Sequence, residues 1–171
     1  MKTHQYEFTG YQNYEEVQKK LEHDCRIALG TDNYPFYLAV NEAVLNAAAY
    51  HVDGPEKARI RITLSIFAFD INVTVSAHTR PFDAGRYRDE LRKLLADKEI
   101  REMDWGDYTA DSDKSRGFWY ILSAVEYCTV DVDGQEITLA VPRPYNPEKR
   151  LSMRIKDLVP KFYVKTNGVI R

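Results

Sequence analysis

Apolar residues recur along the chain at two different spacings, and each spacing predicts a different kind of element. Spacings of three and four residues predict amphipathic helices over 14–29 and 83–95, and a further helix over 117–125. Strict alternation of apolar and polar residues predicts strands, which are expected over 59–67, 71–75, 127–132 and 135–141. The polar segment 2–8, in which Tyr6 and Phe8 alternate, is a candidate edge strand.

The segment from Tyr34 to about His51 is apolar nearly all round, which predicts a helix buried on every side. Pro35 suits the first turn of this helix, because proline fixes φ and its missing N–H has no partner there. The side chains at 31–32 are expected to cap its start. Glycine at position 30 is expected to end the preceding helix.

Strands that pair locally, with helices between the pairs, predict an α+β fold. We expect a two-layer sandwich in which a mostly antiparallel or mixed sheet is covered on one face by helices. The expected organisation is one domain over 1–145 and a C-terminal extension over 146–171. The charged segment 98–114 is expected to be an exposed loop, and a loop of that length is usually mobile or functional.

Composition narrows the classes of function. The chain has 171 residues, 44% hydrophobic residues and a formal net charge of -2, so it lacks the basic field that nucleic acid would require. The two cysteines, Cys25 and Cys128, lie too far apart in sequence for a metal motif and are expected to be buried free thiols. No signal peptide or membrane-spanning stretch is evident, so we expect a cytoplasmic protein that does not contact a membrane.

Glu42 is the only charged residue between Tyr34 and Tyr50, and Asn46 lies one helical turn after it on the same face. Burying an unpaired carboxylate is costly, so Glu42 needs a partner, water or a ligand. The alternative is that the two residues have no functional role. In that case Glu42 and Asn46 reach solvent or bond to each other.

Three short motifs, in this order, resemble those of the GHKL ATPases, the family of gyrase, MutL, histidine kinases and the anti-sigma-factor serine kinases. The segment 41–47 resembles the family's N-box, and 81–83 resembles the Pro-Phe-Asp that follows its first glycine box. The second glycine box is matched by Ser115, Arg116, Gly117 and Phe118. The likeness is greatest to the anti-sigma serine kinases and implies the histidine-kinase-like ATPase fold.

The resemblance assigns a role to each matching residue. Asn46 is expected to give its side-chain oxygen to Mg²⁺, and Glu42 to act as general base toward the γ-phosphate. Gly117 and the neighbouring amides are expected to hold the phosphates of ATP. The segment 84–114 is expected to be the lid of the nucleotide site.

The sequence departs from the family's pattern at the first glycine box. Ala77 stands where the family has an Asp that accepts a hydrogen bond from adenine, and Thr79 stands where it has a Gly. Losing a buried hydrogen-bond partner typically costs about 1–3 kcal/mol, so these replacements weaken adenine recognition. In the second box, Ser115 replaces the first glycine.

The resemblance implies two functions, which stay open at this point. The first is an anti-sigma regulatory factor of bacterial transcription that uses ATP and Mg²⁺ as a serine/threonine kinase and phosphorylates an anti-sigma antagonist. The second is a non-catalytic module that binds a sigma factor or an antagonist protein after nucleotide binding has been lost or altered. By analogy with the family, a homodimer is also expected.

Overall fold

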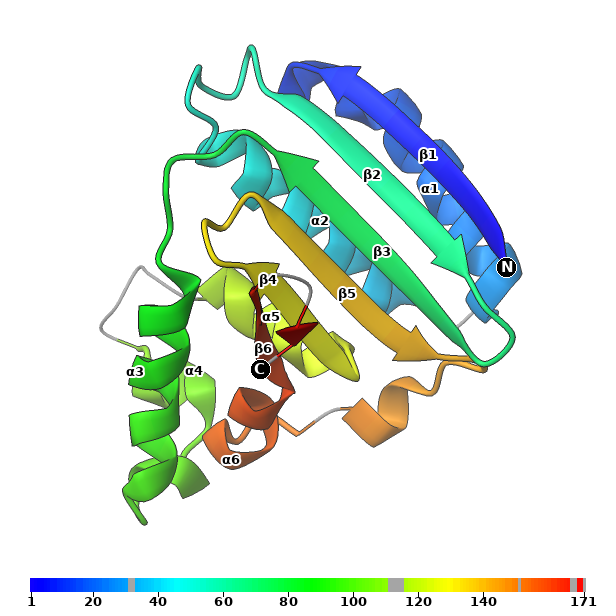
Figure 1. The fold of residues 1–171 in the computed structure, drawn as a ribbon. Coiled ribbons are helices and arrows are strands. Elements are labelled where there is room, and N and C mark those ends of the chain that lie inside the picture. Colours follow the sequence, from blue (N-terminus) through cyan, green and yellow to red (C-terminus); the bar gives the residue numbers. More distant parts are fainter. Residues whose placement is uncertain (31–32, 111–115, 151, 167–168, 171) are drawn as a thin grey trace.

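The alternating segments form one sheet in the computed structural model, which describes the whole chain except 31–32, 111–115, 151, 167–168 and 171 (Figure 1). The described residues form seven strands in the order β1-β2-β3-β5-β4-β6-β7, and among these strands only β4 and β6 pair in parallel. The strands are β1 (Lys2–Thr9), β2 (Arg59–Ile66), β3 (Asp70–Ala77), β4 (Tyr127–Asp131), β5 (Glu136–Pro142), β6 (Phe162–Thr166) and β7 (Val169–Ile170). The expectation of a mostly antiparallel α+β sheet is confirmed.

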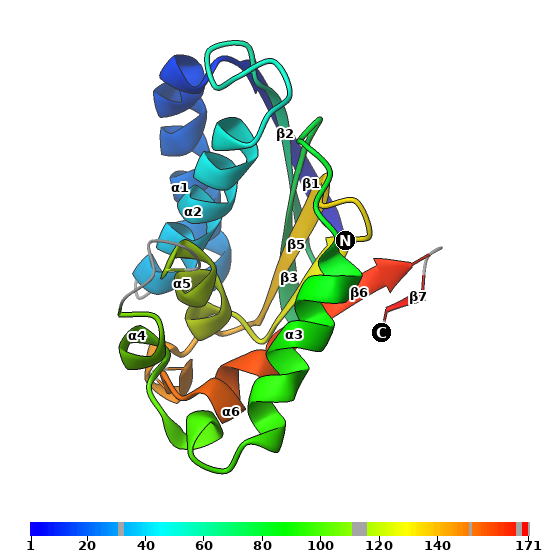
Figure 2. The same ribbon diagram turned by 90° about the vertical axis from the view of Figure 1, so that its left-hand side faces the viewer.

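Three helices cover one face of this sheet, namely α1 (Tyr14–Leu29), α2 (Tyr34–Ala49) and α5 (Arg116–Ala124) (Figure 2). The core lies between the two layers, because alternate residues of β2, β3 and β5 point toward the helices and are buried or partly buried. The opposite sheet face carries short polar side chains such as Thr63, Thr74 and Thr138, which lie opposite one another across β2, β3 and β5. The layers therefore form the expected sandwich.

The helix starts and ends follow local sequence signals closely. Helix α1 has the bounds expected from its periodicity. Gly30 ends it with a φ of 97°, a backbone conformation that residues with a side chain rarely adopt. Helix α2 begins with Pro35 in its first turn and Asn33 at its N-cap position. The capping residues expected at 31–32 lie outside the described residues. Both cysteines are buried free thiols, as expected.

The expectation that α2 is buried on every side is wrong along one stripe. Tyr34, Leu38 and Leu45 are 65%, 39% and 43% exposed, respectively. The sheet lies beneath α2, and α1 and α5 lie on either side of it (Figure 2), which leaves its outer side to solvent. The sequence could not distinguish this exposed apolar stripe from a buried one.

The expectation of an exposed loop over 98–114 holds only in part for the described residues, most of which are exposed but which include two helical turns and a buried tryptophan. After α3 (Ala84–Ala96), the chain forms a 3₁₀ turn (Ile100–Glu102) and a short helix α4 (Trp105–Tyr108). Trp105 is 2% exposed, and its backbone N–H donates to Met153 O over 2.9 Å. This segment is therefore packed against the C-terminal part of the chain.

The C-terminal extension contributes to the same sheet and core. A 3₁₀ turn (Pro147–Arg150), the short helix α6 (Ile155–Leu158) and a second 3₁₀ turn (Val159–Lys161) lead into β6, which lies beside β4. Helix α3 packs on β6 and α6, so the expected lid segment is anchored over its described part. Among the described residues, no helix is both long enough and apolar enough to cross a membrane.

Candidate functional site

Glu42 lies directly against Gly117, which brings together two of the sequence motifs that are far apart along the chain. A Cβ atom placed on Gly117 would come within 1.7 Å of Glu42 Oε1 and 2.5 Å of its Cδ. Only glycine leaves room for this position of the carboxylate. Gly117 is in the first turn of α5, where the exposed N–H groups favour negative charge. The half-buried carboxylate of Glu42 is therefore placed where an anion is favourable.

Helices α2 and α5 run in opposite directions along this contact. Leu38 of α2 lines one cavity together with Tyr120 of α5. Glu42 lies one turn after Leu38 in α2, and it contacts Gly117, which lies three residues before Tyr120 in α5. Asn46, half-buried and a further turn along α2, therefore lies beyond the first turn of α5. The side chains of Glu42 and Asn46 share one flank of α2, on the α5 side of the helix.

Ala77 and Thr79 lie at the other end of this flank. The backbone N–H of Arg80 donates to Tyr50 O over 2.8 Å, and Val52 N–H donates to His78 O over 3.0 Å. The segment 78–80 is thus tied to the C-terminal end of α2. Glu42 and Tyr50 are about 12 Å apart along the helix axis, at about 1.5 Å per residue. Asn46 lies between them, so the three expected parts of the site follow one another along α2.

The Thr79 side chain is held by packing and by a hydrogen bond. It is buried, and its hydroxyl donates to Gly134 O over 3.1 Å. Ala77, half-buried at the end of β3, donates its N–H to Gln135 O over 3.0 Å. Both residues therefore fasten this loop to the turn between β4 and β5. The position where the resemblance expects adenine recognition holds a methyl group and a hydroxyl that already has an acceptor.

Phe118 has a packing role that the sequence motif did not indicate. Its ring lies 5.1 Å from that of Phe162 and 5.6 Å from that of Tyr87, measured between ring centroids. Phe82 joins the same cluster through Tyr87, at 5.4 Å. These rings come from α5, β6, α3 and the loop before α3. Phe118 therefore links the start of α5 to the C-terminal strand.

The structure describes little of the remaining residues of the second glycine box. Ser115 lies outside the described residues. Arg116 is the first residue of α5, and its backbone belongs to the same first turn as Gly117, whereas its side chain lies outside the described part. The phosphate-holding role expected for these two residues stays a prediction.

The donor chemistry along this flank suits a hard cation only in part. Asn46 offers an amide oxygen and Glu42 two carboxylate oxygens, which are the ligand types that Mg²⁺ prefers. Across the described segments, no group of three or more His, Cys, Asp or Glu side chains converges on one point. Magnesium at this position would therefore need phosphate and water oxygens for most of its coordination.

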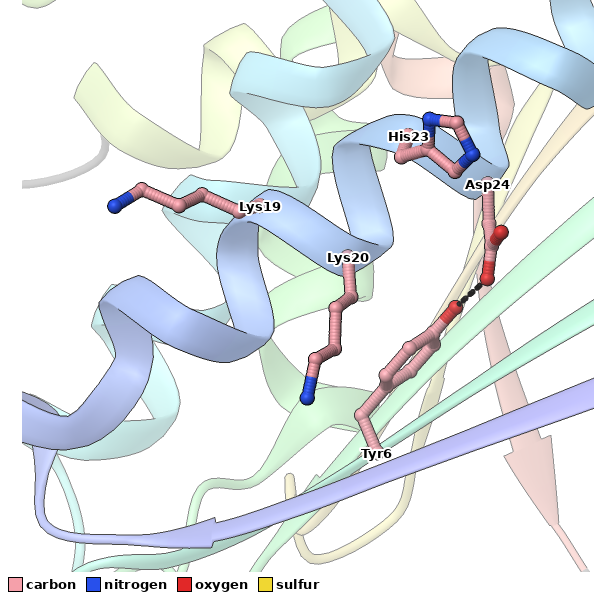
Figure 3. A pocket seen from close by; sticks show the side chains of 5 residues that line it. All are labelled: Tyr6, Lys19, Lys20, His23 and Asp24. Atoms are coloured by element: carbon pink, nitrogen blue, oxygen red, sulfur yellow. Dashed lines mark hydrogen bonds between the residues drawn. The ribbon is translucent and has the colours of Figure 1, made fainter.

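Two hollows in the described structure lie away from this flank. One, of about 180 Å³, lies between the start of α2 and the end of α5 and includes Leu38, Tyr120 and Met153. The other, of about 350 Å³, lies between α1 and β1 and is lined by Tyr6, Lys19, Lys20, His23 and Asp24 (Figure 3). Sequence reasoning missed the second one. The available sequence signal was that Lys20 and Asp24, four residues apart, lie on the same face of a predicted helix that follows the alternating segment 2–8.

No protein-family model matches the sequence, and no curated protein is significantly similar to it. The structure defines an α+β sandwich, with a candidate site where the Glu42 carboxylate of α2 meets the first turn of α5.

Proposed function

We propose that the protein is a bacterial regulatory factor related to the GHKL anti-sigma serine kinases, acting in the cytoplasm and using the flank of α2 to bind Mg²⁺ and the phosphates of a nucleotide. The contact between Glu42 and Gly117 carries this proposal. The two residues belong to different motifs of the resemblance, 75 positions apart, and nothing in local sequence requires them to meet. Their contact is what a shared site would need.

The proposed chemistry uses the chain's own groups at the phosphate end. The first turn of α5 offers backbone N–H groups to phosphate oxygens. Asn46 supplies its amide oxygen toward Mg²⁺, which when bound would neutralise phosphate charge. Glu42 would then accept the proton of a serine hydroxyl on an antagonist protein as that oxygen attacks the γ-phosphorus and ADP leaves.

Adenine would be recognised weakly in this proposal. Ala77 offers no acceptor to the amino group of the base, and the Thr79 hydroxyl is bonded to Gly134. We therefore expect poor discrimination between ATP and GTP, since discrimination depends on polar groups placed at the base.

Calorimetric titration of the protein with ATP and Mg²⁺ tests the proposal. We expect weak binding, at about millimolar concentrations, that Asn46→Ala abolishes. Asn72→Ala, on β3 at the opposite face of the sheet, is the matched control and should bind as the native protein does. No heat and no thermal shift with either nucleotide would eliminate nucleotide binding as the function.

A transfer assay tests the catalytic part separately. Incubation with labelled ATP and a candidate antagonist should label a serine of the antagonist. Glu42→Gln should abolish transfer and leave binding in place, since glutamine keeps the shape but cannot accept the proton. Transfer at the native rate by this variant would remove Glu42 from the proposed role.

The second candidate, a non-catalytic protein-binding module, is favoured by a different observation. The hydrogen bonds that tie 78–80 to the end of α2, and Thr79 to Gly134, occupy the region where a base would be read. A sigma factor or antagonist would then bind without nucleotide. Complex formation that is equally strong with and without ATP, and that Asn46→Ala leaves unchanged, would favour this module over the kinase.

A further inference from the structure

Strand β1 forms one edge of the sheet, and it is long and regular. All eight residues pair in one continuous register with β2, from Lys2 opposite Ile66 to Thr9 opposite Arg59. The strand contains no proline, and its register has no bulge, so two common devices that protect an edge are absent from it. Its second side therefore presents backbone N–H and C=O groups that another strand can pair with.

Helix α1 lies over the face of β1 that carries His4, Tyr6 and Phe8. The Tyr6 hydroxyl donates to the Asp24 carboxylate, and His4 Nδ1 lies 2.9 Å from the same oxygen of Asp24. The single carboxylate that lines the cavity between α1 and β1 is thus already engaged by two partners. Burial and the bond to Asp24 raise the pKa of Tyr6, which keeps its hydroxyl protonated.

The other polar groups around this cavity of about 350 Å³ are cationic or can become so. Figure 3 shows Lys20 extending from α1 toward β1 beside Tyr6, with His23 one turn further along the helix. Lys19 points away from β1 in the same view, and its ammonium group lies 2.7 Å from the Glu15 carboxylate. Lys20 is therefore the cationic group that a ligand beside Tyr6 would meet.

Strand geometry connects the open edge to the cavity. In a sheet, residues directly opposite each other on neighbouring strands point to the same face. The residue of an added strand that pairs with Tyr6 would therefore point toward α1, into the cavity beneath Lys20. The carboxylate of Glu7 points to the opposite face, where it contacts Arg59 and Arg61, and so does not compete.

We propose that the β1 edge binds an extended acidic segment of a partner protein. The segment adds to the sheet as a further strand, and a Glu or Asp opposite Tyr6 forms an ion pair with Lys20. Main-chain pairing supplies affinity, and the charge in the cavity supplies register and selectivity. This site is independent of the nucleotide flank, which lies on α2 and α5.

A blocked octapeptide of alternating valine and glutamate is a suitable probe, studied with the 171-residue chain by amide NMR. We expect shifts and slowed hydrogen exchange at the amides of β1 and in α1 near Lys20. The same peptide with glutamine in place of glutamate should bind about tenfold more weakly, and added salt should weaken the acidic peptide more than the neutral one.

Variants localise the effect. Lys20→Glu should weaken acidic-peptide binding at least tenfold, whereas Lys57→Glu, the same change in the exposed loop before β2, should leave it unchanged. Circular dichroism would verify that both variants are folded. No shifts at β1 with the peptide at millimolar concentration, or equal binding by the Lys20→Glu variant, would each overturn the proposal. A homodimer in sedimentation whose β1 amides are already protected from exchange, and which the peptide does not dissociate, would also overturn it.

Discussion

Among individual side chains, Glu42 and Gly117 depend on each other most directly. The Glu42 carboxylate occupies the space that the Cβ atom of any other residue at position 117 would need. This contact explains why position 117 holds a glycine. Glycine is about 1 kcal/mol worse than alanine within a helix, so Gly117 costs α5 some stability and makes room for the Glu42 carboxylate.

A double-mutant cycle measures this dependence. Gly117→Ala in the native background should lower the free energy of unfolding by about 1 kcal/mol, because Glu42 must leave its position. In a Glu42→Ala background the same change should be neutral or stabilising, since the clash is gone and alanine favours the helix. Urea denaturation of the four proteins should therefore give a coupling of about 1–2 kcal/mol. Additive effects would contradict the contact.

The buried thiols predict how stability changes at alkaline pH. Burial raises the pKa of Cys25 to about 12 and also raises the pKa of Cys128. In the unfolded chain each thiol has a pKa of about 8.5, so above that pH the unfolded state binds fewer protons than the folded state. Stability should therefore be fully present below about pH 8 and decline as pH rises from about 9 toward 12.

Unfolding measured at pH 8 and pH 10 tests this sign. The free energy of unfolding should be lower at pH 10, and a Cys25→Ala/Cys128→Ala variant should lose less between the two values. Tyr6 and Tyr14, whose pKa values are also raised, would account for the remaining decline. A thiol reagent at pH 8 should label neither cysteine until the protein unfolds. Rapid labelling of the folded protein would contradict the assigned burial.

Among the helices and strands, α5 is joined to α3 and β6 by contacts between aromatic rings. Phe118→Ala should lower the free energy of unfolding by about 2–3 kcal/mol, because it removes ring contacts with Tyr87 and Phe162. Phe69→Ala, at an 82% exposed position in the turn between β2 and β3, is the matched control and should change it by less than about 0.5 kcal/mol. Equal effects in denaturant would show that Phe118 does not anchor α5.

The sequence predicted these elements where local periodicity decides the structure. Helix α1 and the two hairpins follow from spacing alone, since a face of each packs on the core. The same reasoning failed for Trp105, whose burial depends on Met153 and the C-terminal segment, some 48 residues away. It also could not place Glu42 against Gly117 without the family resemblance. Long-range contacts of this kind leave no period in the sequence.

Across the complete molecule, the C-terminal segment closes one side of the core. Strand β6 gives β4 its second neighbour, and α3 rests on β6 and α6. Five of its large apolar side chains are nearly or fully buried, namely Ile155, Leu158, Val159, Phe162 and Val164. At about 2 kcal/mol for each buried side chain, they contribute about 10 kcal/mol, which is comparable to the net stability of a domain.

Truncation tests whether this segment is part of the folding unit. A chain ending at Arg154 should lose the cooperative thermal transition, because β4 becomes an edge and the aromatic cluster around Phe162 loses a member. A chain ending at Thr166 removes only β7 and its flanking residues, whose side chains are exposed at 169–170, and should melt within a few degrees of the native protein. Circular dichroism and calorimetry compare the two. A cooperative transition at the native temperature in the shorter chain would show that residues 1–154 fold alone and that β6 is an appendage.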